Sequence, residues 1–129
     1  MRLYGIGIDV VETERIRSSI ERFGEQFLDR VFTAREIEYC RRSKTPEQQF
    51  GARWAAKEAV SKAFGTGIGK EVGWKEIEVV RQPSGEPLVE LSGGAATYAA
   101  GLGVREVKVS LTHTAHYAAA NAVILCEEG

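Results

Sequence analysis

The sequence has no long apolar run, no signal peptide and few cysteines, which are the features typical of membrane-spanning and secreted proteins. No apolar run approaches the ~20 residues that a membrane-spanning helix needs. The amino terminus does not read as a signal peptide, because Gly5, Gly7 and Asp9 interrupt any apolar core. Cys40 and Cys126 are the only cysteines, and they lie too far apart for a zinc-site spacing. We therefore expect a cytoplasmic protein with two reduced cysteines that serve in packing.

The sequence also lacks the marks of linkers, repeats and a dominant charge. It contains three prolines in 129 residues and no low-complexity run, so residues 1–129 are expected to form a single domain. The formal net charge of -1 argues against a protein that binds nucleic acid over its whole surface. Basic residues nevertheless gather in two short segments: Arg15, Arg17 and Arg22 in the first, and Arg41, Arg42 and Lys44 in the second.

Hydrophobic periodicity predicts an α+β fold. The expected order is a strand at 2–11, a helix at 12–23, one or two helical turns at 25–32, helices at 34–43 and 46–64, strands at 75–81 and 88–91, a helix at 92–102, and strands at 105–112 and 117–126. With the turns at 25–32 left aside, this order is β-α-α-α-β-β-α-β-β. Thr33 and Glu36 have the spacing of a capping box. Pro46 suits the first position of the long central helix, and Gly65 suits its end. Short turns between adjacent strands indicate a mainly antiparallel sheet packed with that central helix.

The central helix carries the most informative pattern. Glu58 and Lys62 are four residues apart and therefore lie on the same side of the helix. Small residues form a neighbouring stripe that permits close packing: Ala52, Ala55, Ala56, Ala59 and Ala63. A charged pair beside a close-packed face, followed by the glycine-rich turn 65–69, suits a phosphate and metal site. The alternative is an exposed helical ion pair worth only a few tenths of a kcal/mol.

Asp9 closes the first strand, where aspartate is disfavoured and costly to bury without a partner. It could cap the helix that starts near Glu12. It could equally be a metal ligand, because carboxylate oxygens suit magnesium and calcium. Both interpretations stay open on spacing alone.

The turn 65–70 resembles a phosphate-binding P-loop only superficially. Glu71 follows Lys70 where that motif requires serine or threonine, and the turn follows a helix instead of a strand. We interpret it as a helix terminus whose free amides could contact an anion.

Four other residues are candidates for contacts. His113 and His116 are three apart, but a zinc site would need a third ligand nearby, so zinc hydrolysis is a minor alternative. His113 ends a strand among hydroxyl residues, and we favour it as a ligand contact.

Arg15 and Arg22 are seven apart and share one helix face. That face is either solvated surface or a dock for an acidic partner.

Three segments together resemble one family: Gly-Ile-Gly-Ile-Asp at 5–9, the stretch from Phe50 through Arg53-Trp54-Ala-Ala-Lys-Glu to Gly69, and Ser-Leu-Thr-His-Thr at 110–114. The chain resembles the bacterial holo-[acyl-carrier-protein] synthases, the small stand-alone members of the 4'-phosphopantetheinyl transferase superfamily. The resemblance covers nearly the whole chain, and residues 23–49 support it least.

The resemblance implies an activity and an assembly. The enzyme would move 4'-phosphopantetheine from coenzyme A to a serine of apo acyl carrier protein, release adenosine 3',5'-bisphosphate and support fatty-acid biosynthesis. It would use magnesium and form a homotrimer whose active sites are shared between neighbouring subunits. The implied roles are metal binding by Asp9 and Glu58, phosphate contact by Lys62, further coenzyme A contacts by Arg53, Gly65, Gly67, His113 and Thr114, and carrier-protein docking by Arg15 and Arg22.

The chemistry is consistent with those roles. Magnesium prefers one or two carboxylates together with phosphate oxygens and water. Glu58 is the candidate to take the serine proton, directly or through a metal-bound water. Two other functions compete: a metal-dependent phosphohydrolase acting on coenzyme A or nucleotides, and a non-catalytic module that binds carrier protein.

Overall fold

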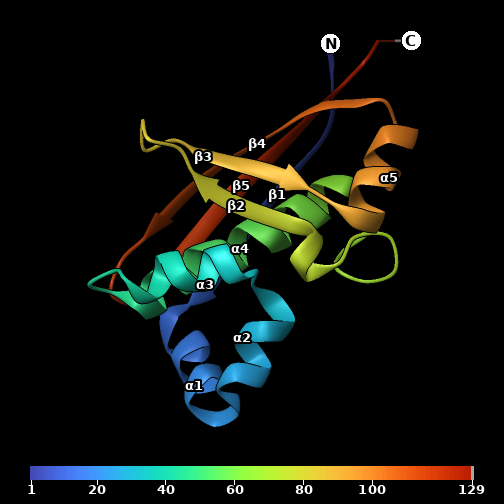
Figure 1. The fold of residues 1–129 in the computed structure, drawn as a ribbon. Helices are drawn as coiled ribbons and strands as arrows, with labels where there is room; N and C mark the ends of the chain where they lie inside the picture. Colours follow the sequence, from blue (N-terminus) through green and yellow to red (C-terminus); the bar gives the residue numbers. More distant parts are fainter. Residues whose placement is uncertain (129) are drawn as a thin grey trace.

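A computed structural model describes residues 1–128 and follows the predicted order of elements, except that the helical turns expected at 25–32 form a further helix (Figure 1). The elements are β1 (Arg2–Glu12), α1 (Thr13–Phe23), α2 (Glu25–Val31), α3 (Ala34–Arg41), α4 (Pro46–Phe64), the 3₁₀ turn η1 (Trp74–Glu76), β2 (Ile77–Arg81), β3 (Pro87–Leu91), α5 (Gly93–Gly101), β4 (Val104–His113) and β5 (Tyr117–Cys126). The fold is α+β, and the strand pairs are antiparallel.

Two sheets make up the β structure. The larger sheet has the strand order β1-β5-β4, and β2 pairs with β3 in a separate hairpin. In the larger sheet, Asp9 of β1 is opposite Ala120 of β5, and Leu111 of β4 is opposite the same alanine. No helix within residues 1–128 is long and apolar enough to cross a membrane.

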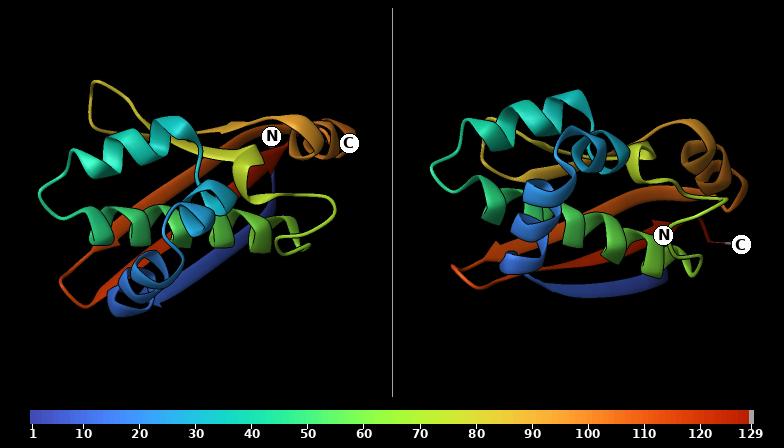
Figure 2. Two further views of the ribbon diagram at one scale, coloured as in Figure 1. Left: turned by 60° about the horizontal axis from the view of Figure 1, so that its bottom comes forward. Right: turned by 90° about the horizontal axis from the view of Figure 1, so that it is seen from below.

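Helix α4 runs through the middle of the molecule, between the three-stranded sheet and a layer that contains α3 and the β2–β3 hairpin (Figure 2). It contacts β1, β5 and β4 on one side and α1, α3 and β2 on the other. A helix enclosed on several sides needs small or apolar residues around most of its circumference. The five alanines of the predicted stripe are accordingly all buried.

Two glycines of β1 let the strand approach α4 at backbone distance. A Cβ atom added to Gly5 would lie 2.0 Å from the carbonyl oxygen of Ala63, and one added to Gly7 would lie 2.0 Å from that of Ala59. No larger residue fits such a gap. This close contact brings the next inward-facing residue of β1, Asp9, to the surface of α4.

The termini of the helices agree with the sequence signals in most places. Thr33 and Glu36 form the expected capping box, and Gly65 ends α4 with a φ of 84°. The helix after Thr33 ends at Arg41, slightly before the expected Ser43. The predicted strand at 75–81 begins with a 3₁₀ turn and becomes a strand only at Ile77.

A buried ion pair connects α4 with the layer opposite the sheet. Lys57 Nζ lies 2.8 Å from Glu36 Oε1, and both side chains are fully buried. The same ammonium donates to the carbonyl oxygens of Trp74 and Ile77 at 2.9 and 2.6 Å. The second oxygen of Glu36 accepts the backbone N–H of Val79. The pair therefore joins α3, α4, η1 and β2, which explains how two buried charges are tolerated.

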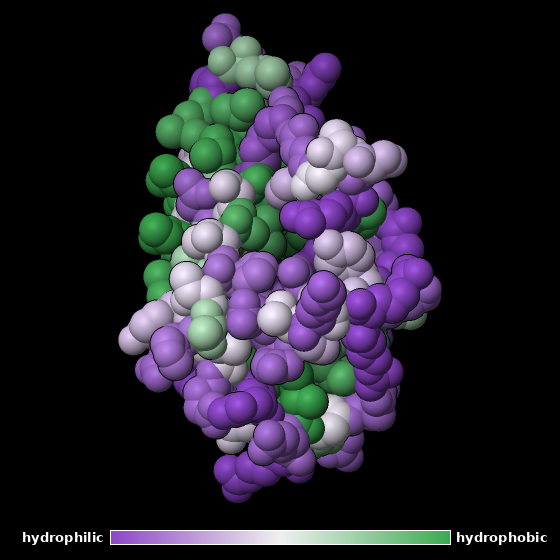
Figure 3. Space-filling view, turned by 90° about the vertical axis from the view of Figure 1, so that its left-hand side faces the viewer, coloured by the Kyte–Doolittle hydropathy of each residue, from purple (hydrophilic) through white to green (hydrophobic). Residues whose placement is uncertain are grey.

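The outer face of the large sheet leaves an apolar stripe exposed on β1. Ile6, Ile8 and Val10 alternate with the inward-facing residues and are 66, 66 and 60% exposed. Figure 3 shows apolar side chains gathered along this side of the surface. Phe23 at the end of α1 is also exposed.

Candidate active site

A single strip of α4 reaches the surface in the second half of the helix. Between Phe50 and Phe64, all residues are buried except Trp54, Glu58 and Lys62. The three are spaced by four residues and so follow one another along one side of the helix. Trp54 stacks on Trp74 with ring centroids 5.5 Å apart. The polar end of the strip is therefore the Glu58–Lys62 pair that the sequence singled out.

Asp9 joins this strip and does not cap a helix. The N-cap residue of α1 is Glu12, so the capping interpretation of Asp9 was wrong. Lys62 Nζ donates to Asp9 Oδ1 at 2.8 Å and to the carbonyl oxygen of Ile8 at 3.1 Å. The alternative of a Glu58–Lys62 helical ion pair does not hold either, because within residues 1–128 the ion pair of Lys62 is made with Asp9.

The environment raises the pKa of the Glu58 carboxyl above its ordinary value. Burial is the main cause, the negative charge of Asp9 adds to it, and the positive charge of Lys62 opposes it. A carboxylate with a raised pKa is a stronger base than an ordinary glutamate. Two carboxylates that disfavour each other's charge are also a suitable environment for a cation.

Asp9 has an oxygen that fits a metal ligand. Its side chain is only 11% exposed, and Oδ2 is buried without a hydrogen-bond partner in the part of the chain that the structure describes. Buried carboxylate oxygens are costly when left unpaired. Magnesium takes one or two carboxylates and leaves its remaining positions to water and phosphate. Asp9 and Glu58 fit that donor set.

The amides of the glycine turn are less available than the sequence suggested. The backbone N–H of Gly65 donates to Lys62, and those of Thr66 and Gly67 both donate to the carbonyl oxygen of Ser61. These bonds close the last turn of α4, as expected after a left-handed C-cap. The prediction of free amides at Gly65 and Gly67 was therefore wrong, although both glycines remain open to surrounding space.

Arg53 and His113 line a separate cavity of about 550 Å³. The cavity lies between α4, the β2–β3 hairpin and β4, and its wall also contains Arg81. The buried guanidinium of Arg53 lies 4.3 Å from the ring centroid of Tyr39, a cation–π contact. Glu86 is the acidic residue of the wall, so the two arginines leave the cavity basic, and with the histidine they suit a phosphate-bearing ligand.

Sequence reasoning missed the residue that connects these two cavity side chains. Gln49 Oε1 accepts from Arg53 Nη1 at 2.8 Å, and Gln49 Nε2 lies 3.3 Å from His113 Nε2. Gln48 Oε1 lies 2.9 Å from the other ring nitrogen of the histidine. The spacing of four between Gln49 and Arg53 was the available signal.

The two groups of candidate residues lie on opposite sides of α4. Arg53 and Lys62 are nine residues apart, which corresponds to about half a turn of net rotation and a rise of ~13 Å. Arg53 packs toward Tyr39 of α3, whereas Lys62 contacts Asp9 of β1. One chain therefore holds an acidic centre and a basic cavity that do not merge into a single pocket.

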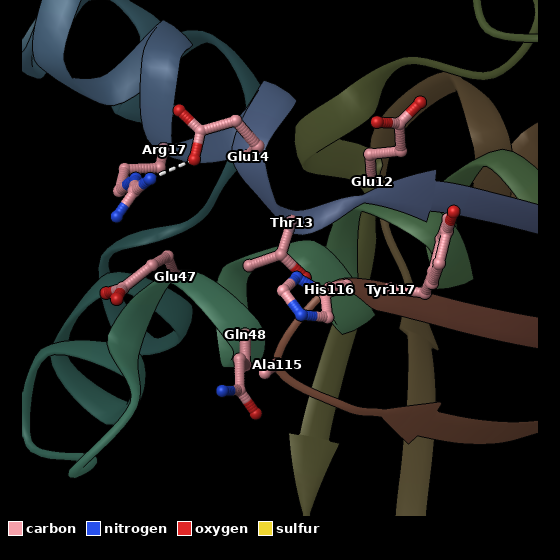
Figure 4. Close-up of a pocket in the computed structure, with 9 residues that line it drawn as sticks. All are labelled: Glu12, Thr13, Glu14, Arg17, Glu47, Gln48, Ala115, His116 and Tyr117. Carbon is pink, nitrogen blue, oxygen red and sulfur yellow. Dashed lines mark hydrogen bonds and ion pairs between the residues drawn. The ribbon is translucent and has the colours of Figure 1, made fainter.

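The remaining histidine lies elsewhere. Figure 4 shows His116 beside Thr13 and Gln48, in a second cavity of about 470 Å³ that also includes Glu12 and Arg17. Within residues 1–128, no group of three or more histidine, cysteine and acidic residues could hold a metal ion. A zinc site built on His113 and His116 therefore receives no support.

Thr114 and the two arginines of α1 have simpler surroundings. The hydroxyl of Thr114 accepts the backbone N–H groups of His116 and Tyr117, so it shapes the β4–β5 turn. Arg15 and Arg22 are both exposed, and the Arg22 guanidinium lies 5.4 Å from the ring centroid of Phe23. The basic face predicted for α1 therefore lies at the surface.

Comparisons with known proteins identify the family of the chain. The chain is 46% identical over 122 residues to a holo-[acyl-carrier-protein] synthase of Koribacter versatilis, covering 95% of this chain and 98% of the relative. The crystal structure of the Neisseria meningitidis holo-[acyl-carrier-protein] synthase matches with a TM-score of 0.90 and 29% identity, over 96% of this chain and 99% of that one. The Helicobacter pylori synthase, solved in complex with coenzyme A, matches with a TM-score of 0.84 and 32% identity, over 93% and 99%. The family model described as the 4'-phosphopantetheinyl transferase superfamily matches residues 5–121. This chain therefore belongs to the 4'-phosphopantetheinyl transferase superfamily.

Proposed function

We propose that the protein transfers 4'-phosphopantetheine from coenzyme A to a serine hydroxyl of apo acyl carrier protein and releases adenosine 3',5'-bisphosphate. The observation that carries the proposal is the acidic centre, in which Asp9 of β1 meets Glu58 and Lys62 of the exposed strip of α4. Relatives named holo-[acyl-carrier-protein] synthase support it. The product would serve fatty-acid biosynthesis, and the cytoplasmic location expected from the sequence remains a prediction.

Each residue of the acidic centre has a role in that chemistry. The serine oxygen attacks a phosphorus of the pyrophosphate, and the bond from that phosphorus to the other phosphate breaks. Asp9 and Glu58 would hold magnesium, which when bound offsets charge that develops on the phosphoryl oxygens. Lys62 would contact the same phosphates. Glu58 would accept the serine proton, directly or through a water, and its raised pKa favours this role.

The basic cavity would hold the part of coenzyme A that does not react. Arg53 and His113 offer donors for phosphate or for the adenine base, and Arg81 adds a positive charge. Gly65, Gly67 and Thr114 remain candidates for further contacts, with the glycines providing space instead of amide donors. A magnesium requirement and coenzyme A contacts at these residues are proposals that rest on the resemblance and on the geometry above.

A homotrimer with shared active sites would bring the acidic centre of one subunit next to the basic cavity of another. One subunit's acidic centre and another subunit's basic cavity would bind the same coenzyme A, because α4 separates them within one chain. The exposed stripe of Ile6, Ile8 and Val10 is an apolar surface of the kind that subunit contacts cover. Arg15 and Arg22 on α1 would receive an acidic helix of the carrier protein.

The test separates transfer from hydrolysis. The protein is incubated with coenzyme A and magnesium, with and without apo carrier protein, and adenosine 3',5'-bisphosphate is measured by chromatography. A transferase releases it only when apo carrier protein is present. Release without carrier protein would favour a phosphohydrolase, and no release under either condition would leave only the binding module.

A further inference from the structure

The contact between Lys62 and Asp9 has a consequence for metal binding. The Lys62 ammonium uses two of its donors within the chain, toward Asp9 Oδ1 at 2.8 Å and toward the carbonyl oxygen of Ile8 at 3.1 Å. Lys62 therefore occupies the Asp9 carboxylate, which the proposed function assigns to the metal. A lysine bound to Asp9 in this way is turned toward β1.

The two side chains differ in their freedom to move. The Asp9 side chain is 11% exposed and fixed on the inward face of β1, whereas the Lys62 side chain is 48% exposed. A lysine has a flexible stem of four carbons, and an ion pair of this exposure is worth little. The lysine can therefore leave the carboxylate at small cost, while the carboxylate stays in place.

The local charge balance favours a cation beside Asp9 in the metal-free protein. Asp9 and Glu58 together would carry two negative charges in a partly buried position. Lys62 supplies one compensating charge, and a divalent cation would supply two. Once a divalent cation is bound, Asp9 no longer needs the lysine, and the ammonium becomes available for an anion.

We propose that Lys62 is a place-holding cation: it neutralises Asp9 in the metal-free protein and exchanges to the phosphates of coenzyme A when a divalent cation takes the carboxylate. The inference rests on the proposed function, since it needs Asp9 as a metal ligand. It predicts that metal binding precedes productive coenzyme A binding. It also predicts that Lys62 and the metal compete for Asp9 in the absence of coenzyme A.

The competition is tested with Mn²⁺ as the probe and without coenzyme A. Free Mn²⁺ is followed by electron paramagnetic resonance during titration of the full-length wild type and of Lys62→Met. The variant should bind Mn²⁺ more tightly, with a Kd lower by about two- to fivefold, the range expected for a partly exposed ion pair. An unchanged or higher Kd would overturn the proposal, because a lysine that orients Asp9 for the metal would have the opposite effect.

A control separates direct competition from a general change in charge. Lys70→Met removes one positive charge from the loop that follows α4, outside the contact with Asp9. It should leave the Kd for Mn²⁺ within the experimental error of the wild type. An equal gain in affinity in both variants would mean that charge alone is responsible and would overturn the place-holding role.

A second readout follows the lysine itself. The ¹⁵N resonance of the Lys62 ammonium, assigned by its loss in Lys62→Met, should shift on addition of Mg²⁺ and show faster hydrogen exchange as its two bonds are released. An unchanged resonance at saturating Mg²⁺ would contradict the exchange. Phosphopantetheine transfer by the wild type is measured separately, so that failure of the place-holding role can be distinguished from failure of the proposed function. Transfer without these metal effects rejects only the place-holding lysine, whereas a wild type that neither transfers nor binds Mn²⁺ rejects the proposed function as well.

Discussion

Gly7 of β1 lies so close to Ala59 of α4 that a Cβ atom added to the glycine would be 2.0 Å from the alanine's carbonyl oxygen. This backbone contact is what places Asp9, two residues further along the strand, beside Glu58 and Lys62. The acidic centre therefore depends on the absence of a side chain at Gly7 as much as on its charged residues.

We expect Gly7→Ala to reduce the free energy of unfolding by about 3 kcal/mol or more, because backbone atoms cannot give way as a flexible side chain can. Gly101→Ala is the matched control, since nothing lies within 4 Å of the added Cβ. Urea denaturation should show little change for the control. Equal stability of both variants would contradict the close approach of β1 to α4.

The neighbouring residues Lys57 and Glu58 have different surroundings. Glu58 is part of the acidic centre, whereas Lys57 is buried against Glu36 on another side of α4. Burial is the main cause that lowers the pKa of Lys57. A sequence motif that contains both residues thus combines a functional side chain with a structural one.

Lys57→Met should therefore destabilise the protein by about 3–5 kcal/mol, because it leaves the Glu36 carboxylate buried without its partner. The double variant Glu36→Gln with Lys57→Met should recover part of that loss, which chemical denaturation of all three proteins would measure. A single variant as stable as the wild type would refute the structural role of the pair.

Sequence signals within one element were sufficient to predict most of the fold. The capping box at Thr33 and the ends of α4 at Pro46 and Gly65 depend on residues close in the chain, and all were confirmed. The partner of Lys62 was not predictable in this way. Periodicity placed Glu58 beside it, but the lysine reaches Asp9, which is 53 residues away and is brought near only by the packing of β1 on α4.

The same limit applies to the basic cavity. Arg53 could be selected from the motif, but its position opposite Lys62 becomes meaningful only once α3 and β4 surround the helix. Gln49 was missed because its partner His113 lies 64 residues away on β4. The turn amides were misjudged because the left-handed C-cap directs them to carbonyl oxygens in the last turn of α4, which a helix end otherwise leaves unpaired.

Glu76 gives the protein a pH-dependent source of stability. Its carboxylate accepts the backbone N–H groups of Gly73, Gly94 and Ala95 at 2.9, 2.7 and 3.2 Å, and these bonds lower its pKa in the folded state, that of Gly73 most. A lowered folded pKa stabilises the protein above the ordinary glutamate pKa, and this contribution is lost as the pH falls through the folded value.

Glu76→Gln should consequently be less stable than the wild type near neutral pH, and the difference should shrink in acid. Thermal unfolding from pH 7 down to pH 3 would measure it. Glu21→Gln, an exposed glutamate of α1, is the control and should show no such trend. A difference that stays constant over the whole pH range would contradict the assigned cause.

The apolar outer face of β1 is expected to form a contact between subunits. Ile8→Asp should convert the proposed trimer into monomers, as measured by light scattering, because it places a charge in an apolar contact. The monomer should remain folded, since the Ile8 side chain is 66% exposed in the single chain. Thr97→Asp on the surface of α5 should leave the assembly unchanged. A wild type that is monomeric at working concentration would reject the trimer.

We expect the acidic centre to perform the transfer, and intact-mass spectrometry of apo acyl carrier protein measures that transfer itself. The carrier protein is incubated with coenzyme A, magnesium and either the wild type or Glu58→Gln, a change that barely alters helix propensity. We expect a gain of one phosphopantetheine group with the wild type, no gain when a chelator is added, and a rate at least about 100-fold lower with the variant. Near-normal transfer by Glu58→Gln would show that the acidic centre does not perform the transfer.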